Sequence, residues 1–228
     1  TPTREGYTFD GWYTATSGGV KIETGATVTI TKNTTLYARW SAISYTIAFN
    51  GNGATSGTTS SIVAKYGETY ALTSNGFSRK YLVTYDANGG SVSPASEEST
   101  YQFAGWNTMA DGTGTSYNNG ASVNNLRSTE GTFTLYAKWN ADSVTLPTPT
   151  RTGYKFNGWY TASTGGERIG AGGSSYTPKA NETIYAQWSA NTYTLSFNVN
   201  GGNAIGDVTT NVTYNGKYPE LPAVTRTG

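Results

Sequence analysis

Alternating apolar and polar positions mark three short segments of the chain. Residues 45–53, 81–90 and 193–202 each carry apolar side chains at every second position and then run into an Asn- and Gly-rich stretch. The alternation is typical of a half-buried strand, and the Asn/Gly stretch is typical of a hairpin turn. The residues expected on the inner faces of these strands are Tyr45, Ile47, Phe49, Tyr81, Val83, Tyr85, Tyr193, Leu195 and Phe197.

A second pattern occurs in three copies, at residues 6–40, 101–139 and 153–188. Each copy begins with an aromatic strand that contains Gly-Trp, continues through a Gly-rich middle and closes with a strand that reads Tyr-Ala-x-Trp. Self-similarity of this kind predicts small modules in tandem. We call the segment that begins with Tyr the front half and the segment with two Trp the rear half; a full unit contains both.

The closing strand of each rear half has one apolar face. Side chains alternate along a strand, so Leu36, Ala38 and Trp40 share one face while Tyr37 lies on the other. The equivalent apolar residues are Leu135, Ala137, Trp139, Ile184, Ala186 and Trp188. The outward Tyr37, Tyr136 and Tyr185 are predicted to form a contact surface, although outward Tyr also supports neighbouring strands in one-sided sheets.

The Trp side chains are predicted to form the structural core of the modules. One Trp of each rear half follows a Gly, which permits a bulge or a close approach of the backbone. Each ring can bury on the order of 200 Å². The alternative is a platform of exposed rings on which sugars stack, but the apolar faces favour packing. The six predicted core residues are Trp12, Trp40, Trp106, Trp139, Trp159 and Trp188.

The order of the halves divides the chain into five segments. The expected segments are a rear half at 1–42, a degenerate front half at 43–79, a complete repeat at 80–140, a repeat with a shortened front half at 141–190 and a further front half at 191–228. The rear half of the 43–79 segment is missing, because residues 74–77 lead straight into the next front half.

The halves at the two ends of the sequence allow two interpretations. The chain can be a segment of a longer array, or the front half at 191–228 can dock onto the rear half at 1–42 of another copy. A missing strand leaves an edge that invites pairing, and head-to-tail contacts that do not close into a ring build filaments. Both interpretations stay open from the sequence.

Composition and charge narrow the class of protein. The 228 residues include 29 glycines, and abundant Thr, Ser and Asn suit strands and turns better than helices. The formal net charge is +1, with Lys and Arg scattered singly, so no partner nucleic acid is expected. No apolar run approaches about 18 residues, and we expect no membrane insertion in this segment.

The residue types offer little for catalysis or metal binding. The chain contains no His and no Cys, which removes the common general base, the strongest nucleophile and thiolate metal sites. Acidic residues do not keep their positions across the copies, since Asp10 corresponds to Ala104 and Asn157. Residues 86–90 have the composition of a calcium loop, but the equivalent loops begin with Asn50 and Asn198, so a turn is favoured. We expect no catalytic residue, no cofactor and no metal.

The repeated phrases resemble a known family. The rear halves with Gly-Trp and Tyr-Ala-x-Trp, together with the front phrase at residues 83–90, closely resemble the Listeria/Bacteroides repeat, the B-repeat family of large bacterial surface proteins. The resemblance covers most of the chain. It implies compact β-grasp-like modules in tandem on secreted or cell-wall-attached proteins, where they serve as stalk, spacer or adhesive element. The segments at 43–79 and 141–190 depart from the pattern.

These observations predict a mainly β, elongated tandem array of small β-rich repeats without enzymatic activity. The expected function is that of an extracellular stalk, spacer or fibre-forming element at the bacterial cell surface or cell wall, with head-to-tail completion of split repeats as one mechanism. The alternative is an adhesin or carbohydrate-binding module that uses exposed Tyr and Trp. The expected partners are neighbouring repeats or other copies of the chain, and a host or matrix glycan or protein in the adhesin alternative.

Overall fold

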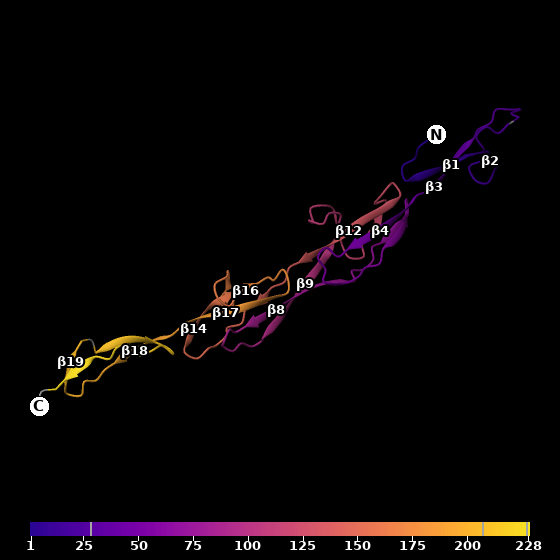
Figure 1. The fold of residues 1–228 in the computed structure, drawn as a ribbon. Helices are drawn as coiled ribbons and strands as arrows, with labels where there is room; N and C mark the ends of the chain where they lie inside the picture. Colours follow the sequence, from indigo (N-terminus) through magenta and orange to yellow (C-terminus); the bar gives the residue numbers. More distant parts are fainter. Residues whose placement is uncertain (28, 207, 227) are drawn as a thin grey trace. The chain divides into compact units, whose positions relative to one another are not determined.

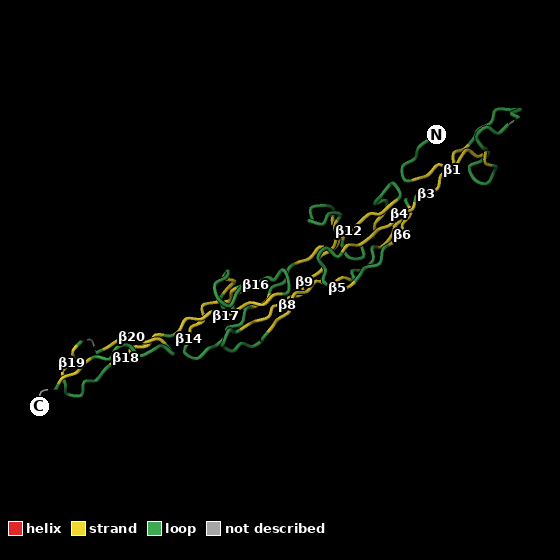
Figure 2. Tube along the Cα trace, in the orientation of Figure 1, coloured by secondary structure: helices red, strands yellow, loops and turns green. Residues whose placement is uncertain are grey.

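The protein is built from strands and loops throughout its described residues. The computed structural model describes residues 1–27, 29–206, 208–226 and 228, and Figure 2 shows no helix among them. The chain divides into two compact units: the first holds Thr1–Arg79 and Tyr101–Asn140, and the second holds Lys80–Thr100 and Ala141–Gly228. The mainly β fold predicted from the alternation is confirmed.

Both units consist of short strands that are drawn as arrows in Figure 1. The strands of the first unit, with β8 and β9 shared between the units, are β1 (Tyr7–Tyr13), β2 (Lys21–Ile22), β3 (Tyr37–Ala42), β4 (Ser44–Asn50), β5 (Ser56–Gly57), β6 (Ile62–Lys65), β7 (Thr69–Ala71), β8 (Phe77–Asp86), β9 (Ser96–Asn107), β10 (Ser116–Tyr117), β11 (Ser122–Asn124) and β12 (Gly131–Asn140). Those that follow in the second unit are β13 (Val144–Thr145), β14 (Tyr154–Tyr160), β15 (Arg168–Gly170), β16 (Ser175–Tyr176), β17 (Glu182–Ala190), β18 (Thr192–Ser196), β19 (Asn203–Ile205), β20 (Thr209–Thr213) and β21 (Ala223–Thr225).

Residues 1–42, which we call the N-terminal half-module, form a three-stranded antiparallel sheet in the order β2-β1-β3. The register slips between Phe9 and Gly11, where Gly11 has a φ of 138° that favours glycine. The second unit repeats the slip between Phe156 and Gly158. Without it, Phe and the Trp three positions later would face opposite sides of the strand. The bulge therefore brings both rings to one face.

The first complete module combines residues 43–79 with residues 101–140. Its front strand β4 runs parallel to the closing strand β12, in register from Gly131 opposite Tyr45 to Tyr136 opposite Asn50; Figure 1 shows the two side by side. Strand β6 pairs with β4, and β9 pairs with β12, both antiparallel. The buried core consists of Tyr45, Ile47, Ala64, Leu72, Trp106, Val123, Leu135 and Ala137.

The second complete module combines residues 80–100 with residues 141–190. Its front strand β8 runs parallel to β17, from Glu182 opposite Val83 to Tyr185 opposite Asp86. On the other side of β17 lies β14, which also pairs with β15. The buried core consists of Val83, Tyr85, Val144, Leu146, Trp159, Ile184 and Ala186. The two modules therefore repeat one plan, in which a front strand pairs in parallel with the closing strand of a rear half.

Each complete module is assembled from two separated stretches of chain. The front half at 43–79, which no rear half follows directly, shares its core with residues 101–140. The interrupting residues 80–100 share a core with residues 141–190. The five segments expected from the sequence divide the chain into successive repeats. Their boundaries, including those of the repeat at 80–140, stay a prediction. The strand pairing shows which halves complete one another.

The described residues of 191–228, which we call the C-terminal half-module, form two two-stranded sheets whose strands interleave along the chain. Strand β18 pairs with β20, and β19 pairs with β21, both antiparallel. Within the part of the chain that the structure describes, β18 has no parallel partner of the kind that β4 and β8 have. The N-terminal half-module is incomplete in the opposite sense, since β3 pairs with β1 alone among the described strands.

Candidate assembly surfaces and module junctions

The Gly-linked Trp rings of the complete modules lie at the centre of the two cores. Trp106 and Trp159 are both 0% exposed. Trp106 contacts Phe49 of its front half with ring centroids 4.6 Å apart, and Trp159 contacts Tyr85 at 5.2 Å. In each core a rear-half ring thus packs directly on the front strand. The structure places these two predicted core residues in the interior.

The closing Trp of each complete module hydrogen-bonds the rear half to the front turn. Trp139 Nε1 donates to the carbonyl oxygen of Gly51 at 2.9 Å, and Trp188 Nε1 donates to that of Ala87 at 3.0 Å. Both rings are half-buried and pack against their cores. The acceptors occupy the same place in the two front turns, so the bond is a repeated feature of a completed module.

The Trp residues of the N-terminal half-module have a different environment. Trp12 is 42% exposed, although it follows the same Gly bulge as Trp159. Its ring contacts Phe9 edge-on at 5.6 Å, and the half-buried Trp40 contacts Phe9 from another side at 5.3 Å. The three rings form a small cluster that no described front half covers. Trp12 therefore stands apart from the other Trp residues predicted to be core.

The three Tyr residues predicted as a contact surface are not equivalent in exposure. Tyr37 is 38% exposed, whereas Tyr136 and Tyr185 are half-buried. Tyr136 and Tyr185 lie in the parallel registers opposite Asn50 and Asp86, and Tyr37 has no such neighbour among the described residues. Exposure of this position follows the presence or absence of a front half.

The front turn of each complete module contains an Asn that bonds a loop and the closing strand of the rear half. Asn52 and Asn88 both have a φ of 47°. Asn52 Nδ2 donates to the carbonyl oxygens of Ala110 at 2.8 Å and Ala137 at 2.9 Å. Asn88 Nδ2 donates in the same way to Ser163 at 2.9 Å and to Ala186 at 3.0 Å. Sequence analysis recognised the turn but missed these bonds; the signal was an Asn at the same turn position in all three front halves.

The oxygen-rich loop at residues 86–90 forms this turn. Asp86 Oδ1 accepts a hydrogen bond from the backbone N–H of Asn88 at 2.8 Å, which is an Asx turn. No group of three or more His, Cys, Asp or Glu side chains that could hold a metal ion occurs in the described part of the chain. The loop is built as a turn around Asn88.

A junction joins the N-terminal half-module to the front half that follows it. The N–H of Ile43 donates to the carbonyl of Gly6 at 3.0 Å, and the N–H of Tyr66 donates to that of Ile43 at 3.0 Å. Gly6 has a φ of 75°, and a Cβ there would lie 2.2 Å from Cγ of Tyr66. Tyr66 meets the ring of Tyr7 edge-on at 5.7 Å, and the Arg4 guanidinium lies 3.9 Å from the centre of the Tyr7 ring.

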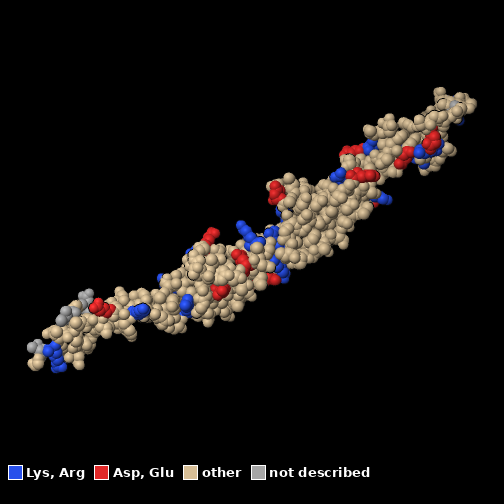
Figure 3. Space-filling model, viewed as in Figure 1, with Lys and Arg blue, Asp and Glu red and all other residues tan. Residues whose placement is uncertain are grey.

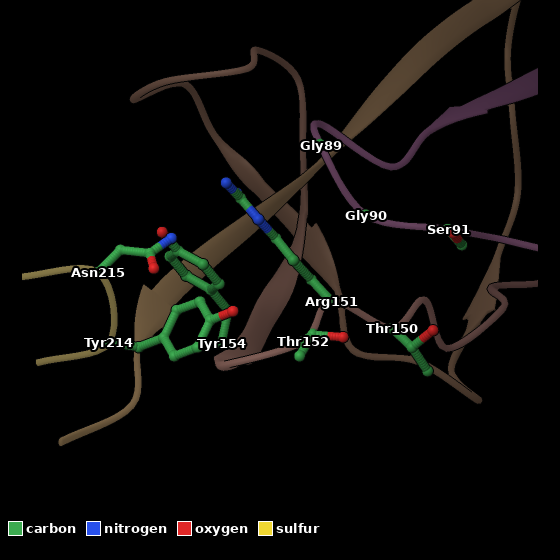
Figure 4. A pocket seen from close by; sticks show the side chains of 9 residues that line it. All are labelled: Gly89, Gly90, Ser91, Thr150, Arg151, Thr152, Tyr154, Tyr214 and Asn215. Atoms are coloured by element: carbon green, nitrogen blue, oxygen red, sulfur yellow. The ribbon is translucent and has the colours of Figure 1, made fainter. Parts of the chain in front are cut away.

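The second unit contains the same junction. Asn191 N–H donates to the carbonyl of Gly153 at 2.9 Å, and Tyr214 N–H donates to that of Asn191 at 2.8 Å. Gly153 has a φ of 78°, and a Cβ there would lie 2.3 Å from Cγ of Tyr214. Tyr214 meets Tyr154 edge-on at 5.6 Å, and Arg151 lies 4.0 Å from the centre of the Tyr154 ring. Figure 4 shows the two Tyr rings and Arg151 together.

A hollow of about 550 Å³ lies beside the second junction. Arg151 extends from the ring of Tyr154 towards the front turn, where its Nη1 donates to the carbonyl of Asn88 at 3.2 Å (Figure 4). The remaining lining is mainly glycine backbone and hydroxyl groups of Ser91, Thr150 and Thr152. The guanidinium thus already has a ring and a carbonyl as partners, and the hollow is part of the junction.

The Arg–Tyr stack also occurs where residues 80–100 interrupt a module. The Arg79 guanidinium lies 4.7 Å from the centre of the Tyr101 ring. In the other copies Arg and Tyr are three positions apart, as in Arg4 and Tyr7. The stack therefore forms across the interruption as if Tyr101 followed Arg79 closely, which supports the assignment of residues 43–79 and 101–140 to one module.

Charged side chains do not gather into a single-sign patch on the face shown in Figure 3, where they lie singly or in small mixed groups. Lys80 Nζ contacts Glu98 Oε1 at 2.7 Å, and this bond lowers the pKa of Glu98. Burial, with Glu97 nearby, raises the pKa of Tyr85 to about 12, and burial beside Glu182 raises that of Tyr176 to about 12. These Tyr shifts come from packing in the second core.

Among the described residues there is no helix of the length and apolar character needed to cross a bilayer.

Several bacterial proteins are similar to this chain. A Gly-rich membrane protein of Evansella cellulosilytica is 28% identical over 239 residues, covering 90% of this chain and 25% of that protein. A membrane protein of the same organism is 32% identical over 149 residues, covering 64% of this chain and 19% of that protein. Internalin H of Listeria monocytogenes is 44% identical over 52 residues, covering 23% of this chain and 10% of that protein.

The chain thus spans a quarter or less of the length of these relatives. No solved structure matches it.

A family model describes most of the sequence. The model of the Listeria-Bacteroides repeat domain matches residues 1–39, 94–138, 140–187 and 193–228. These segments cover most of both half-modules and most of the rear halves of both complete modules. The resemblance carried by Gly-Trp and Tyr-Ala-x-Trp is confirmed, and the chain belongs to the Listeria-Bacteroides repeat domain family.

Proposed function

We propose that this chain is a non-enzymatic spacer region of a bacterial surface protein, in which repeated junctions set the orientation between successive modules. Repeat domains of this family are generally non-catalytic. The named relatives include an internalin and membrane proteins, which supports a location at the bacterial surface. The observation that carries the proposal is the recurrence of one junction geometry in both units.

The junction is suited to hold neighbouring modules in one orientation. Its two backbone hydrogen bonds act with an edge-to-face ring pair worth about 0.5–1.5 kcal/mol and an Arg–Tyr stack worth about 0.5–1 kcal/mol. Of these two side-chain contacts the ring pair joins the two modules, because Arg151 and Tyr154 belong to the same module. The ring pair favours the closed junction by roughly two- to tenfold, since about 1.4 kcal/mol is a factor of ten. Gly153 permits the ring of Tyr214 to lie on the backbone, because any side chain would occupy that space. A spacer depends on such nearest-neighbour contacts.

The proposal is tested by the distribution of distances across the second junction. Because the chain has no Cys, spin labels can be placed at Lys179→Cys and Lys217→Cys, two exposed positions on either side. We expect one narrow distribution in the labelled parent and a clearly broader one after Tyr214→Ala. The matched control is Tyr218→Ala, which removes the same side chain from a position that is 79% exposed. A parent distribution as broad as that of Tyr214→Ala would contradict the spacer proposal.

The adhesin alternative depends on exposed aromatic rings. Among the described residues, the aromatic side chains exposed to solvent are Trp12, Tyr37, Tyr193 and Tyr218, and all lie in the half-modules. We therefore prefer the spacer function for the complete modules. Titration of the chain with glycans, followed by NMR, tests the alternative: binding that is lost after Tyr136→Ala or Tyr185→Ala would favour an adhesin.

A further inference from the structure

In each complete module the strand that begins the front half is a direct neighbour of the strand that ends the rear half. β4 runs parallel to β12, with Tyr45 opposite Gly131 at one end of the shared register and Asn50 opposite Tyr136 at the other. β8 and β17 repeat this arrangement in the second complete module. Backbone pairing therefore joins the first strand of each module directly to its last strand.

The direction of these strands decides how tension along the chain acts on the pair. The chain reaches the first complete module at Ile43, directly before β4, and leaves it for the last time at Asn140, the end of β12. Because the two strands are parallel, these points lie at opposite ends of the pair. Tension between them slides β4 along β12 and loads the hydrogen bonds of the shared register together. A pull on both strands at the same end would instead separate them one bond at a time.

Neither of the two loaded strands of the first complete module lies at the edge of its sheet. β4 also pairs with β6, and β12 also pairs with β9. Each strand must therefore slide past two neighbours before it can leave the sheet. Ile47 and Leu135 are fully buried beside the shared register, and hydrogen bonds that are shielded from water are electrostatically stronger than solvated ones. The sheet thus supports the pair on both sides.

Side-chain hydrogen bonds reinforce the end of the pair at which β12 is pulled. The bond from Trp139 Nε1 to Gly51 and the bond from Asn52 Nδ2 to Ala137 both connect the front turn to the last residues of β12. The second complete module has the equivalent two bonds. A pull on the end of β12 therefore loads these side-chain bonds together with the backbone pairing.

We propose that the parallel strand pair of each complete module is a mechanical clamp, which keeps the module folded when tension acts between its first and last strands. The clamp deepens the proposed spacer function and rests on it for the source of the tension, since a spacer at the bacterial surface transmits force between the parts that it separates. Unfolding under force is governed by the rate at which the structure opens. The clamp slows opening along the strands, so the resistance of a module depends on the direction of the pull.

The first test compares two directions of pull on the first complete module by single-molecule force spectroscopy of the full chain. Because the chain has no Cys, Ser44→Cys combined with either Asn140→Cys or Glu130→Cys supplies two exposed handles. The pair at 44 and 140 slides the strands, whereas the pair at 44 and 130 opens them from the end where Tyr45 lies opposite Gly131. We expect the first pair to rupture at several times the force of the second at the same loading rate. Equal rupture forces overturn the clamp.

The second test weakens the pulled end alone. Asn52→Gly accepts the φ of 47° and removes the side-chain bond to Ala137, so it should lower the rupture force between handles 44 and 140 and leave that between 44 and 130 unchanged. The matched control is Asn215→Gly, at a φ of 56° outside this module, which should change neither force. An equal fall in both directions after Asn52→Gly would indicate general destabilisation and overturn the clamp.

The two proposals fail separately. The distance measurement across the Tyr214 junction reports the orientation of neighbouring modules without force, whereas the rupture force reports the strand pair inside one module. A narrow distance distribution with equal rupture forces would leave the spacer without a clamp, and a broad distribution would contradict the spacer whatever the forces.

Discussion

Trp12 and Trp159 occupy the same place in nearly the same phrase, yet one is 42% exposed and the other is fully buried. Both follow a bulged Gly, and both contact a Phe edge-on. Trp159 differs because it also packs on Tyr85 of a front half and donates from Nε1 to the carbonyl of Pro147 at 2.8 Å. Local sequence is enough for the hairpin, whereas burial of the ring depends on the other half.

The largest expected effect on stability comes from removing the two Trp rings of this comparison. Trp159→Ala removes a fully buried ring and should lower the free energy of unfolding of the second complete module by about 3–5 kcal/mol. Trp12→Ala should lower the free energy of unfolding of its region by roughly 1 kcal/mol or less, because the ring is already 42% exposed to solvent. Hydrogen exchange at the amides of Ile184 and Ala38 separates the two regions. Similar losses in the two regions would contradict the account given for burial.

The same comparison explains which parts of the fold the sequence predicted. Alternation predicted inward positions for Tyr45, Ile47 and Val83, and the structure places all three in the cores. This prediction succeeds because side chains alternate between the two faces of a strand, and that alternation is a local property of the backbone. The bulge at the Gly before each Trp was also foreseen as one of two options, since Gly accepts the positive φ found at Gly11 and Gly158.

The sequence did not indicate that the front half at 43–79 meets the rear half at 101–140, because adjacency along the chain favoured a repeat at 80–140. Tyr45 lies opposite Gly131, although residues 80–100, which contain another front phrase, stand between them in the sequence. Every front half has the same alternation, so pattern alone does not rank the possible partners. Arg79 and Tyr101 held the missing signal, because they complete the Arg–Tyr pair that Arg4 and Tyr7 form at a distance of three positions.

The junction also went unnoticed in the sequence. Tyr66 and Tyr214 each follow a strand of a front half, β6 or β20, and stand before Gly67 and Asn215. Both could be taken as ordinary turn residues, since the contact that gives them a role is with a Gly about sixty positions earlier in the chain. A recurring Tyr before a turn residue was the available signal.

The second effect concerns the front turns. Asn88→Ala removes two hydrogen bonds to rear-half carbonyls and places Ala at a φ of 47°, so the second complete module should lose about 2–3 kcal/mol of unfolding free energy. Asn88→Gly keeps the backbone conformation and should lose only the bonds, about 1–2 kcal/mol. In the C-terminal half-module, Asn200→Gly should change the free energy of unfolding little. Urea unfolding followed by circular dichroism measures each loss, and a large loss for Asn200→Gly would contradict the comparison.

A smaller loss of stability is expected when the closing Trp of a complete module is replaced by Phe. Trp188→Phe keeps an aromatic ring but removes the bond to the carbonyl of Ala87, and should destabilise its module by about 1 kcal/mol. Trp139→Phe should have a matching effect through Gly51 in the first complete module. Trp40 has no front-turn acceptor among the described residues, so Trp40→Phe serves as the control. An equal loss for all three variants would show that ring packing alone matters.

The last substitution, Tyr85→Phe, has the smallest expected effect on stability at neutral pH. Its effect appears at alkaline pH and distinguishes the two complete modules from each other. Phe49 in the first module corresponds to Tyr85 in the second, where burial raises the pKa of the hydroxyl from 10 to about 12. The fold therefore favours the neutral hydroxyl, so this stabilisation is complete below pH 10 and is lost as the pH rises towards 12. Tyr85→Phe should remove that part of the alkaline destabilisation, and Tyr176→Phe, whose pKa is also raised to about 12, should remove a further part. Unfolding midpoints at pH 9 and pH 11.5 measure the change. If Tyr85→Phe loses as much stability between these pH values as the parent, the buried hydroxyl is not the source of the difference.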